Sequence, residues 1–573
     1  MGKSFAMILL AASAVFAAAG VAAAQGGAGD PVYVDQGTDW TQLRRAQFYT
    51  QDQGSQVMPL AWLRALRTAE GAPFLADGLA RYGYLPNPLS AAGLPVGFTS
   101  AIVGGREMAG MTCAACHTRE IRVEGRSYRI DGGPAIVDFQ RFLVDMDAAL
   151  GRVVDDPATF QAFAGAVLGG DSGKPAAVKA LKDQVALWHR REHAIVTRAL
   201  PRPDMWGVGR LDAVSMIFNR LAGLDVGPPP AYLIEENISP ADAPVRYPFV
   251  WNAPRQDFTQ WPGFAPNGNA VLGLARNTGE VYGVFATFHP RKDLVGLADF
   301  HSDNSANFRG LNAIENLLWK IGAPKWPFAV DAALASRGEA LYEQHCGSCH
   351  APKPGKTRSL LYQTWATPKW DVQSDSRQYD VLKREVSTGI LAGQRLPVPV
   401  LSPKLGSRAK AVDLLRVSVL GSLLQHPLDI PLATTGGISA SKVKAVRQAM
   451  TEADAEWKGR TDAVLSPAAT GFAYESRVLN GIWATAPYLH NGSVPTLADL
   501  LTRPEDRPAS FEVGRYYDVA RVGLAADQKG SGQKRVTTGC SDRNSGNSRC
   551  GHDFGTGLSA AEKAALLEYL KVL

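Results

Sequence analysis

Hydrophobic residues recur at intervals of three and four along several long stretches of the chain, which is the spacing of one buried face of an α-helix. The stretches with this spacing are 136–150, 176–200, 311–321, 332–345, 409–424, 439–457 and 559–573. The last stretch begins with a start signal, because Ser559 is followed three residues later by Glu562. This pair predicts a capping box and a helix that runs to the end of the sequence.

Alternating patterns typical of strands are few and short, and the best candidate is 281–288. Long stretches rich in glycine and proline separate the helical segments, notably 228–279 and 396–402. The pattern therefore predicts a mainly α protein with long loops.

The first residues show the order of a secretory signal. Lys3 precedes an apolar stretch over 5–19, and small residues continue to Ala24, after which we expect cleavage. The apolar stretch is short and lacks a stop-transfer pattern, so a membrane anchor is the weaker alternative. No other stretch is apolar for long enough to span a bilayer. We therefore expect residues 1–24 to be a signal peptide and the mature protein to be periplasmic or secreted.

Length and charge narrow the class of protein. The chain has 573 residues, which suggests about two or three domains, and a hydrophobic fraction of 46% is ample for a core. The formal net charge of +6 is mild for this length. No basic block is interleaved with aromatic residues, and we therefore exclude nucleic-acid binding.

Two Cys-x-x-Cys-His motifs use four of the six cysteines. In such a motif the two thiols add to the vinyl groups of a haem, and the adjacent histidine binds its iron. A zinc site would need a second pair of ligands nearby, and a thioredoxin-like pair would be a single motif on a βαβ unit. The sequence therefore predicts two covalently bound haem c groups. The motif residues are Cys113, Cys116, His117, Cys346, Cys349 and His350.

The wide separation of the two motifs suggests two haem domains. We expect an N-terminal haem c domain over 25–327, which includes a large helical and loop elaboration between the motifs. A C-terminal cytochrome c domain over 328–573 begins with an amphipathic helix that leads directly into the second motif.

The ligand opposite each motif histidine decides the function, because a six-coordinate haem transfers electrons and an open one binds a small oxidant. For the second haem the candidates are His552, in a loop just before the last helix, and His490. Cys540 and Cys550 should form a disulfide in an oxidising compartment, and the closed loop ends next to His552. Such a bridge would hold a ligand ring in place, and we favour His552; the alternative is a bridge that only ties a surface loop.

No residue is as well placed for the first haem. His189 and His193 lie four apart on one helix face, among charged residues that suggest a solvated face rather than a ligand pair. We therefore expect the first haem to be open or water-bound.

The segment 474–497, which contains Pro487, Tyr488 and His490, resembles the bacterial di-haem cytochrome c peroxidases. Within that superfamily it is most similar to the branch of the di-haem rubber oxygenases. Further segments resemble the same branch, and together they cover most of the chain: 48–55, 209–213, 260–263, 276–281 and 551–555. The ordinary peroxidases carry a methionine ligand shortly after the Pro-Tyr-x-His motif, whereas 502–506 contains no methionine.

The resemblance implies roles for individual residues. It implies a bis-histidine second haem with His552, and it moves His490 to a supporting position beside the haem. Arg477 becomes a candidate partner of a haem propionate, with an ordinary surface arginine as the alternative. The superfamily often holds a calcium ion between its domains, so calcium is a further candidate.

Three residues are candidates for the chemistry. Trp251 resembles the tryptophan that bridges the two haems in the family, although core packing explains a tryptophan equally well. Phe264 is a candidate for an apolar pocket at the first haem. Glu280 is the best acidic candidate for proton transfer to a bound peroxide; a carboxylate on a helix or strand edge is the alternative.

These features predict an oxidoreductase with one six-coordinate and one open haem. The first interpretation is an oxygenase that uses dioxygen to cleave a carbon–carbon double bond of an apolar polyisoprenoid or related alkene. The second is a peroxidase that reduces hydrogen peroxide with electrons from a donor cytochrome or cupredoxin. A pure electron-transfer cytochrome is the third, and the large elaboration between the motifs argues against it.

Overall fold

The computed structural model describes most of the chain. The described residues are 30–90, 92–202, 204–294, 296–357, 363–397, 400, 402–426, 440–466 and 471–573. The expected signal peptide, 1–24, lies outside them and stays a prediction. Among the helices of the described part, none combines the length and the apolar character needed to cross a bilayer.

The helices predicted from the hydrophobic spacing are confirmed with small shifts at their ends. They are α3 (Phe139–Asp155), α5 (Pro175–Ala199), α8 (Phe308–Leu318), α9 (Ala332–His345), α12 (Ala411–Gln425), α14 (Ala440–Leu465) and α16 (Ala560–Val572). The capping box of α16 is present, since the Ser559 side chain accepts from the Glu562 N–H and the Glu562 carboxylate accepts from the Ser559 N–H.

The remaining helices are shorter or lie in regions that the sequence marks as loops. They are α1 (Gln42–Thr50), α2 (Leu60–Ala65), α4 (Pro157–Leu168), α6 (Ala213–Arg220), α7 (Ala270–Gly283), α10 (Gly347–His350), α11 (Arg377–Leu382) and α15 (Leu497–Leu500).

The prediction of a strand over 281–288 is wrong. Residues 281–283 are the last turn of α7, and Ala286 and Phe288 form only isolated bridges. The glycines of α7 also led the sequence to suggest a loop through residue 279. They are packing positions instead, because a Cβ on Gly273 would lie 2.8 Å from the Glu315 carboxylate of α8, and one on Gly283 would collide with Ile217 of α6.

The expectation of a mainly α fold holds only loosely, with 41% helix and 16% strand. Two sheets have three strands: β1 (Val32–Tyr33), β6 (Arg126–Asp131) and β5 (Thr118–Val123), and then β2 (Met58–Pro59), β4 (Arg106–Met111) and β3 (Phe98–Val103). These two sheets flank the first Cys-x-x-Cys-His motif, which lies between β4 and β5.

The other strands form antiparallel pairs. The pairs are β7 (Arg210–Leu211) with β8 (Val245–Arg246), β9 (Phe258–Thr259) with β10 (Ala265–Pro266), β11 (Arg291–Lys292) with β12 (Ala298–Asp299), β13 (Pro354–Thr357) with β14 (Gln363–Trp365), β15 (Lys369–Trp370) with β18 (Tyr474–Glu475), β16 (Glu385–Ser387) with β17 (Arg408–Lys410), β19 (Ser510–Val513) with β22 (Gln533–Val536), and β20 (Tyr517–Asp518) with β21 (Gly523–Leu524).

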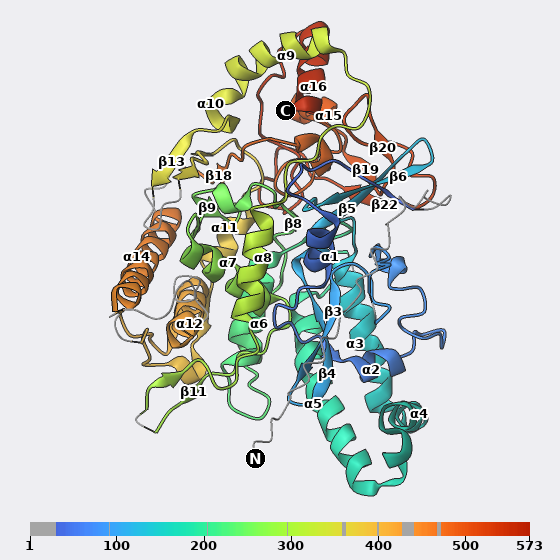
Figure 1. Ribbon diagram of the computed structural model, residues 1–573, viewed down its shortest axis with the longest axis vertical. Coiled ribbons are helices and arrows are strands. Elements are labelled where there is room, and N and C mark those ends of the chain that lie inside the picture. Colours follow the sequence, from blue (N-terminus) through green and yellow to red (C-terminus); the bar gives the residue numbers. More distant parts are fainter. Residues whose placement is uncertain are drawn as a thin grey trace, which may run out of the picture.

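The second motif follows a crossing of two helices. Helix α9, which leads into the motif, packs against the C-terminal helix α16 at the top of the view in Figure 1. Their backbones approach closely at Gly338, where a Cβ would collide with the carbonyl oxygen of Ala565. Glycine at this position therefore sets the distance between the helix that carries the motif and the helix that closes the domain.

The two halves of the chain are interleaved. Helices α12 and α14 lie beside α7 on the left of Figure 1, away from α9 and α16, and they share one hydrophobic core with residues 214–311. On the other side, the Arg122 N–H donates to the Arg515 carbonyl at 2.7 Å. The domain boundary expected between 327 and 328 stays a prediction.

We predict that Gly338→Val destabilises the protein by roughly 1–3 kcal/mol, because the added side chain forces α9 and α16 apart. Denaturant unfolding of the purified protein measures the change. Gly459→Ala is the matched control, since Gly459 is an exposed helical glycine with open space around its Cβ position. That substitution should be neutral or stabilising by up to about 1 kcal/mol. Equal stability of the two variants would contradict the role given to the crossing.

Candidate haem sites

The second motif presents a histidine in the form that metal binding requires. Helix α9 ends at His345, and the His350 N–H donates to the Cys346 carbonyl at 2.9 Å, so that one helical turn separates the two side chains. The Nδ1–H of His350 donates to the backbone carbonyl of Arg477 at 2.6 Å. This hydrogen bond leaves Nε2 as the free ring nitrogen, as in metal-binding histidines whose other nitrogen is held by a carbonyl.

His552 faces His350. The two ring centroids are 6.2 Å apart, with 42° between the ring planes. Two imidazoles on opposite sides of one ion, with metal–nitrogen bonds of about 2 Å, have centroids roughly 6 Å apart. The Nδ1 atom of His552 is buried without a hydrogen-bond partner, and burial lowers the pKa of this ring to about 3, which keeps it neutral. The spacing and the neutral ring of His552 both fit an iron between the two histidines.

A cavity surrounds this pair of histidines. Both thiols of the second motif lie at its wall, and most of the rest of the lining is apolar. The apolar lining includes Leu479, Ile482, Leu489, Leu497, Leu500, Leu501, Leu566 and Leu570. The apolar lining and the position of the thiols together fit a covalently bound porphyrin.

Two buried arginines lie at the same cavity, Arg246 and Arg477. The Arg477 guanidinium pairs with the Glu475 carboxylate, with Nε 2.7 Å from Oε1, and lies 4.6 Å from the Trp261 ring. Arg246 lies 5.1 Å from the same ring, and burial, with Arg477 nearby, lowers its pKa to about 9. The alternative of a surface arginine at 477 is wrong, since this residue is 6% exposed. Two adjacent buried cations fit a ligand with carboxylates, such as the propionates of haem.

His490 lies at the same cavity but is stacked on Tyr474, with ring centroids 4.0 Å apart. Burial lowers the pKa of His490 to about 3, with Arg246 as the second cause. The structure therefore brings both candidate ligands to one cavity, and the ring contact of His350 is with His552.

The loop that carries His552 is held by its backbone. Gly551 and His552 both have left-handed backbone, with φ of 77° and 52°. A Cβ on Gly551 would collide with the Val372 carbonyl, and the His552 N–H donates to that same carbonyl at 2.8 Å. The geometry requires glycine at 551 and fixes the direction of the next side chain.

Arg507 is a residue that the sequence reasoning missed. Its buried guanidinium donates to the carbonyls of Gly551 at 2.7 Å and His552 at 3.0 Å, and also to those of Arg549 and Leu500. Burial lowers its pKa to about 10. Arg507 directly follows the segment 502–506, where the ordinary peroxidases carry their methionine ligand and this chain has no methionine. The residue that supports the His552 loop therefore lies next to the position of the missing methionine.

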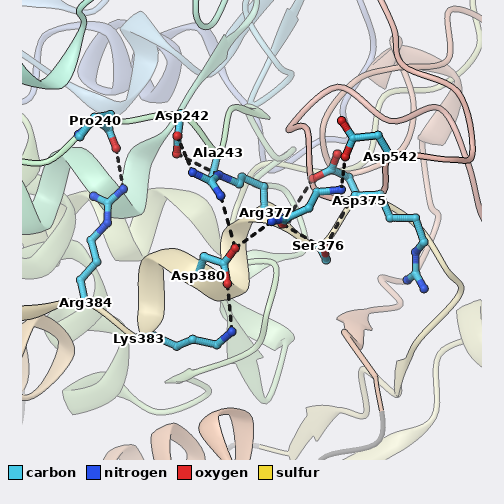
Figure 2. Close-up of polar contacts among 12 residues, drawn as sticks. Pro240, Asp242, Ala243, Asp375, Ser376, Arg377, Asp380, Lys383, Arg384 and Asp542 are labelled. Atoms are coloured by element: carbon cyan, nitrogen blue, oxygen red, sulfur yellow. Dashed lines mark hydrogen bonds and ion pairs between the residues drawn. The ribbon is translucent and has the colours of Figure 1, made fainter.

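The expected disulfide between Cys540 and Cys550 is confirmed, with Cα atoms 5.2 Å apart. The closed loop rests on the segment before α11, since the Ser376 N–H donates to the Arg543 carbonyl at 2.6 Å and the Asp375 carboxylate accepts from the Ser548 N–H at 3.1 Å. Figure 2 shows how this segment is anchored in turn, with Arg377 paired to Asp242 at 2.6 Å. The disulfide loop, α11 and the first half of the chain thus form one support for His552.

The first motif lies in a 3₁₀ turn, Cys113–Ala115, and the Thr112 side chain caps this turn. The Nδ1 atom of His117 donates to the Pro248 carbonyl at 2.8 Å, which again leaves Nε2 free. Burial lowers the pKa of His117 to about 4. Within the described part of the chain, the ring contact of His117 is with Tyr247 at 6.2 Å, and no second histidine faces it.

The motif thiols do not have the properties of a redox pair. Burial raises the pKa of Cys113 and of Cys346 to about 11, and that of Cys116 to about 12. A reactive Cys-x-x-Cys pair has a lowered thiol pKa, and none of the four motif thiols is in a disulfide here. The raised pKa values of Cys113, Cys116 and Cys346 therefore argue against a thioredoxin-like redox pair.

A short segment connects the two sites. Pro248 accepts from His117, the Phe249 ring lies at the second cavity, and Phe249 and Trp251 are stacked with centroids 4.8 Å apart. Trp251 Nε1 donates to the Asn480 carbonyl at 2.8 Å, and the Arg477 guanidinium lies 5.9 Å from the Phe249 ring. Trp251 therefore lies beside Phe249, in the segment that runs from the His117 hydrogen bond to the cavity of the second motif.

Glu280 is a partly buried carboxylate on α7. Its charge is among the causes that raise the pKa of both Cys113 and Cys116, which puts it near the first motif. Gln260, in the turn between β9 and β10, donates to Glu280 at 2.5 Å. Burial raises the pKa of Glu280, and Arg276 opposes this effect. Phe264, in the same turn, is buried in the core that α6 and α7 share with α12 and α14.

The comparisons with known proteins agree with this geometry. A family model described as RoxA-like, cytochrome c-like, matches residues 473–512, and one described as cytochrome C oxidase, cbb3-type, subunit III, matches residues 333–393. The chain is 30% identical over 596 residues to the uncharacterized protein y4iJ of Sinorhizobium fredii, and the alignment covers 93% of this chain and 92% of y4iJ. It is 28% identical over 312 residues to y4iM of the same organism, which covers 53% of this chain and 56% of y4iM.

The two model matches fall on the second motif and on the segment that contains Arg477 and His490. The resemblance to the rubber oxygenase branch of the di-haem cytochromes is thereby confirmed, and cytochrome c domains imply oxidoreductase or electron-transfer chemistry. The chain belongs to one family with y4iJ and is a cytochrome c-type haem protein related to the rubber oxygenase RoxA.

Proposed function

We propose that this protein is an exported di-haem oxidoreductase in which His350 and His552 hold the second iron, while the first iron, held by His117, keeps a position open for dioxygen or peroxide. The observation that carries the proposal is the asymmetry between the motif histidines. His350 has a facing histidine with ring centroids 6.2 Å apart, whereas the ring contact of His117 is with Tyr247. Export is supported by the Cys540–Cys550 disulfide, which is typical of oxidising compartments.

When bound, haem c supplies the electron-carrying iron at the closed site and the iron that reacts with the oxidant at the open site. Arg246 and Arg477 neutralise the propionates at the second site, and Arg507 holds the backbone on both sides of the His552 peptide. Phe249 and Trp251 supply the π-systems between the sites. Phe264 is buried in the core of α6, α7, α12 and α14, and its role at the first haem stays a prediction.

Glu280 is the proposed proton donor at the first site. Its raised pKa means that it stays protonated at a higher pH than a free glutamic acid, and the hydrogen bond from Gln260 fixes its direction. A positioned acid that holds its proton in a buried site is what cleavage of an oxygen–oxygen bond requires.

The reaction that we favour is oxygen-dependent cleavage of a carbon–carbon double bond in an apolar polyisoprenoid or related alkene. The alternative is reduction of hydrogen peroxide with electrons from a donor cytochrome or cupredoxin. The contacts from His350 through Arg477, Phe249 and Pro248 to His117 favour this second candidate, because they offer a short route for such electrons. A calcium ion between the domains remains a prediction.

Incubation of the purified protein with polyisoprene under air, without added reductant, should release carbonyl-terminated fragments detectable by mass spectrometry. In Glu280→Gln the rate should fall by about 100-fold, the usual contribution of a positioned acid. The wild-type rate should also fall as pH rises through the raised pKa of Glu280, because the donor loses its proton, and this limb should vanish in Glu280→Gln. Activity only with hydrogen peroxide and a reducing partner would favour the peroxidase instead. Glu512→Gln, on strand β19 and exposed, is the control.

His552→Ala should convert one low-spin haem to high-spin, because it removes the proposed sixth ligand. Absorption and electron paramagnetic resonance spectra measure the change, and carbon monoxide should bind two sites of the reduced variant but one of the wild type. His490→Ala is the matched control, since it removes a histidine from the same cavity. An unchanged spectrum in His552→Ala, or a high-spin shift in His490→Ala, would contradict the ligand assignment.

Arg507→Met should loosen the same ligand without removing it. Loss of the guanidinium leaves several buried carbonyls without a donor, at about 1–3 kcal/mol for each unsatisfied group, and we expect a mixture of low-spin and high-spin second haem together with a lower melting temperature. Arg503→Met is the control, because Arg503 is an exposed arginine of the same segment. A fully low-spin spectrum in Arg507→Met would show that the hydrogen bonds of Arg507 to the His552 loop are not needed to hold the ligand.

A further inference from the structure

Helices α3 and α5, which lie in the part of the chain between the two motifs, bring three potential metal ligands together. Asp147 lies on α3, and His189 and His193 lie one turn apart on the facing side of α5. His193 Nδ1 is 2.9 Å from one carboxylate oxygen of Asp147, and His189 Nε2 is 3.3 Å from the other. The histidines therefore do not simply form a solvated face, since His189 is largely buried against the carboxylate.

The carboxylate at the centre of this cluster is only partly satisfied by the protein. Asp147 is 7% exposed, and its Oδ2 atom accepts from His193 Nδ1 at 2.9 Å. Its buried Oδ1 atom lies 3.3 Å from His189 Nε2 but has no hydrogen bond of good geometry. The arginine that lines the same hollow, Arg152, directs its guanidinium to the Arg67 carbonyl at 2.8 Å. A buried carboxylate between two imidazoles, with the neighbouring cation engaged elsewhere, is expected to have a cation as its partner.

We propose that Asp147, His189 and His193 bind one divalent transition-metal ion, with Zn²⁺ as the ion to test. Two imidazole nitrogens and one carboxylate oxygen form a donor set typical of zinc and its neighbours. Calcium and magnesium prefer sites built of oxygen ligands, which this cluster does not offer. Three protein ligands leave a fourth position open, and the same three residues line a hollow at the surface.

The geometry needs only a small adjustment. The ligand atoms lie within 4.8 Å of one another, and donors on one ion with bonds of about 2 Å are at most about 4 Å apart. The rings therefore close on the ion by about 1 Å, which the half-exposed His193 side chain is free to do. Gly151 leaves room for His189, because a Cβ at that position would lie 3.3 Å from His189 Nε2. Binding replaces the ring proton that His193 shares with Asp147 and ties α3 to α5.

Equilibrium dialysis of the metal-stripped, haem-loaded protein against Zn²⁺, with elemental analysis, tests the site. The wild type should bind one zinc per chain, and zinc should raise its melting temperature. His193→Ala and Asp147→Asn should weaken zinc binding by at least about 10–100-fold, because each removes a ligand. Asp155→Asn is the matched control, since Asp155 lines the same hollow and the substitution removes the same charge.

Three results would overturn the proposal. The first is a wild type that takes up no stoichiometric zinc. The second is an Asp155→Asn variant that loses as much affinity as Asp147→Asn, which would indicate general electrostatic attraction. The third is a His193→Ala variant that binds zinc as tightly as the wild type. His193 is half exposed, so its replacement keeps the test valid even where Asp147→Asn fails to fold.

Discussion

Each motif histidine donates its Nδ1–H to a backbone carbonyl that lies far away along the chain. His117 is bonded to Pro248, 131 residues away, and His350 to Arg477, 127 residues away. Holding Nδ1 in this way leaves Nε2 of each motif histidine free and turned in a fixed direction, as in metal-binding histidines. Both carbonyls belong to irregular segments, so only long-range packing can place them beside the two histidines. The interleaving of the two halves of the chain provides this packing.

The protein alone leaves several buried groups around the second site in an unfavourable state. Arg246 and Arg477 are buried cations at one cavity. The Glu475 carboxylate pairs with Arg477, whereas Arg246 donates to the backbone carbonyls of Leu489 and Thr485. Burial of such groups is unfavourable unless a partner of opposite character is present. A haem supplies carboxylates, an iron and a large apolar face at once. The structure around the cavity is therefore best understood as one component of a holoprotein.

The support of His552 illustrates how a loop ligand is made rigid without a helix or strand. The disulfide, the left-handed backbone at 551 and 552, and the carbonyl clamp of Arg507 act on three different parts of the same loop. Together they restrain the backbone of the loop, so that mainly the side-chain torsions of His552 are left to vary. The first site has a different support, with strands on both sides of the motif, which fits a site that does not need a second ligand held opposite the first.

The sequence by itself determined the chemistry that local patterns encode. Adjacent motif residues, the capping box at Ser559, the helical spacing and the disulfide of Cys540 and Cys550 all depend on short-range geometry, and these expectations agree with the structure. The sequence misread α7, because glycines that break an isolated helix are tolerated where neighbouring helices need close contact. It also missed Arg246, Arg507 and the carbonyls of Pro248 and Arg477. Only the tertiary structure decided that His552 rather than His490 faces His350, and that His189 and His193 meet Asp147, because burial and long-range hydrogen bonds depend on which distant segments pack together.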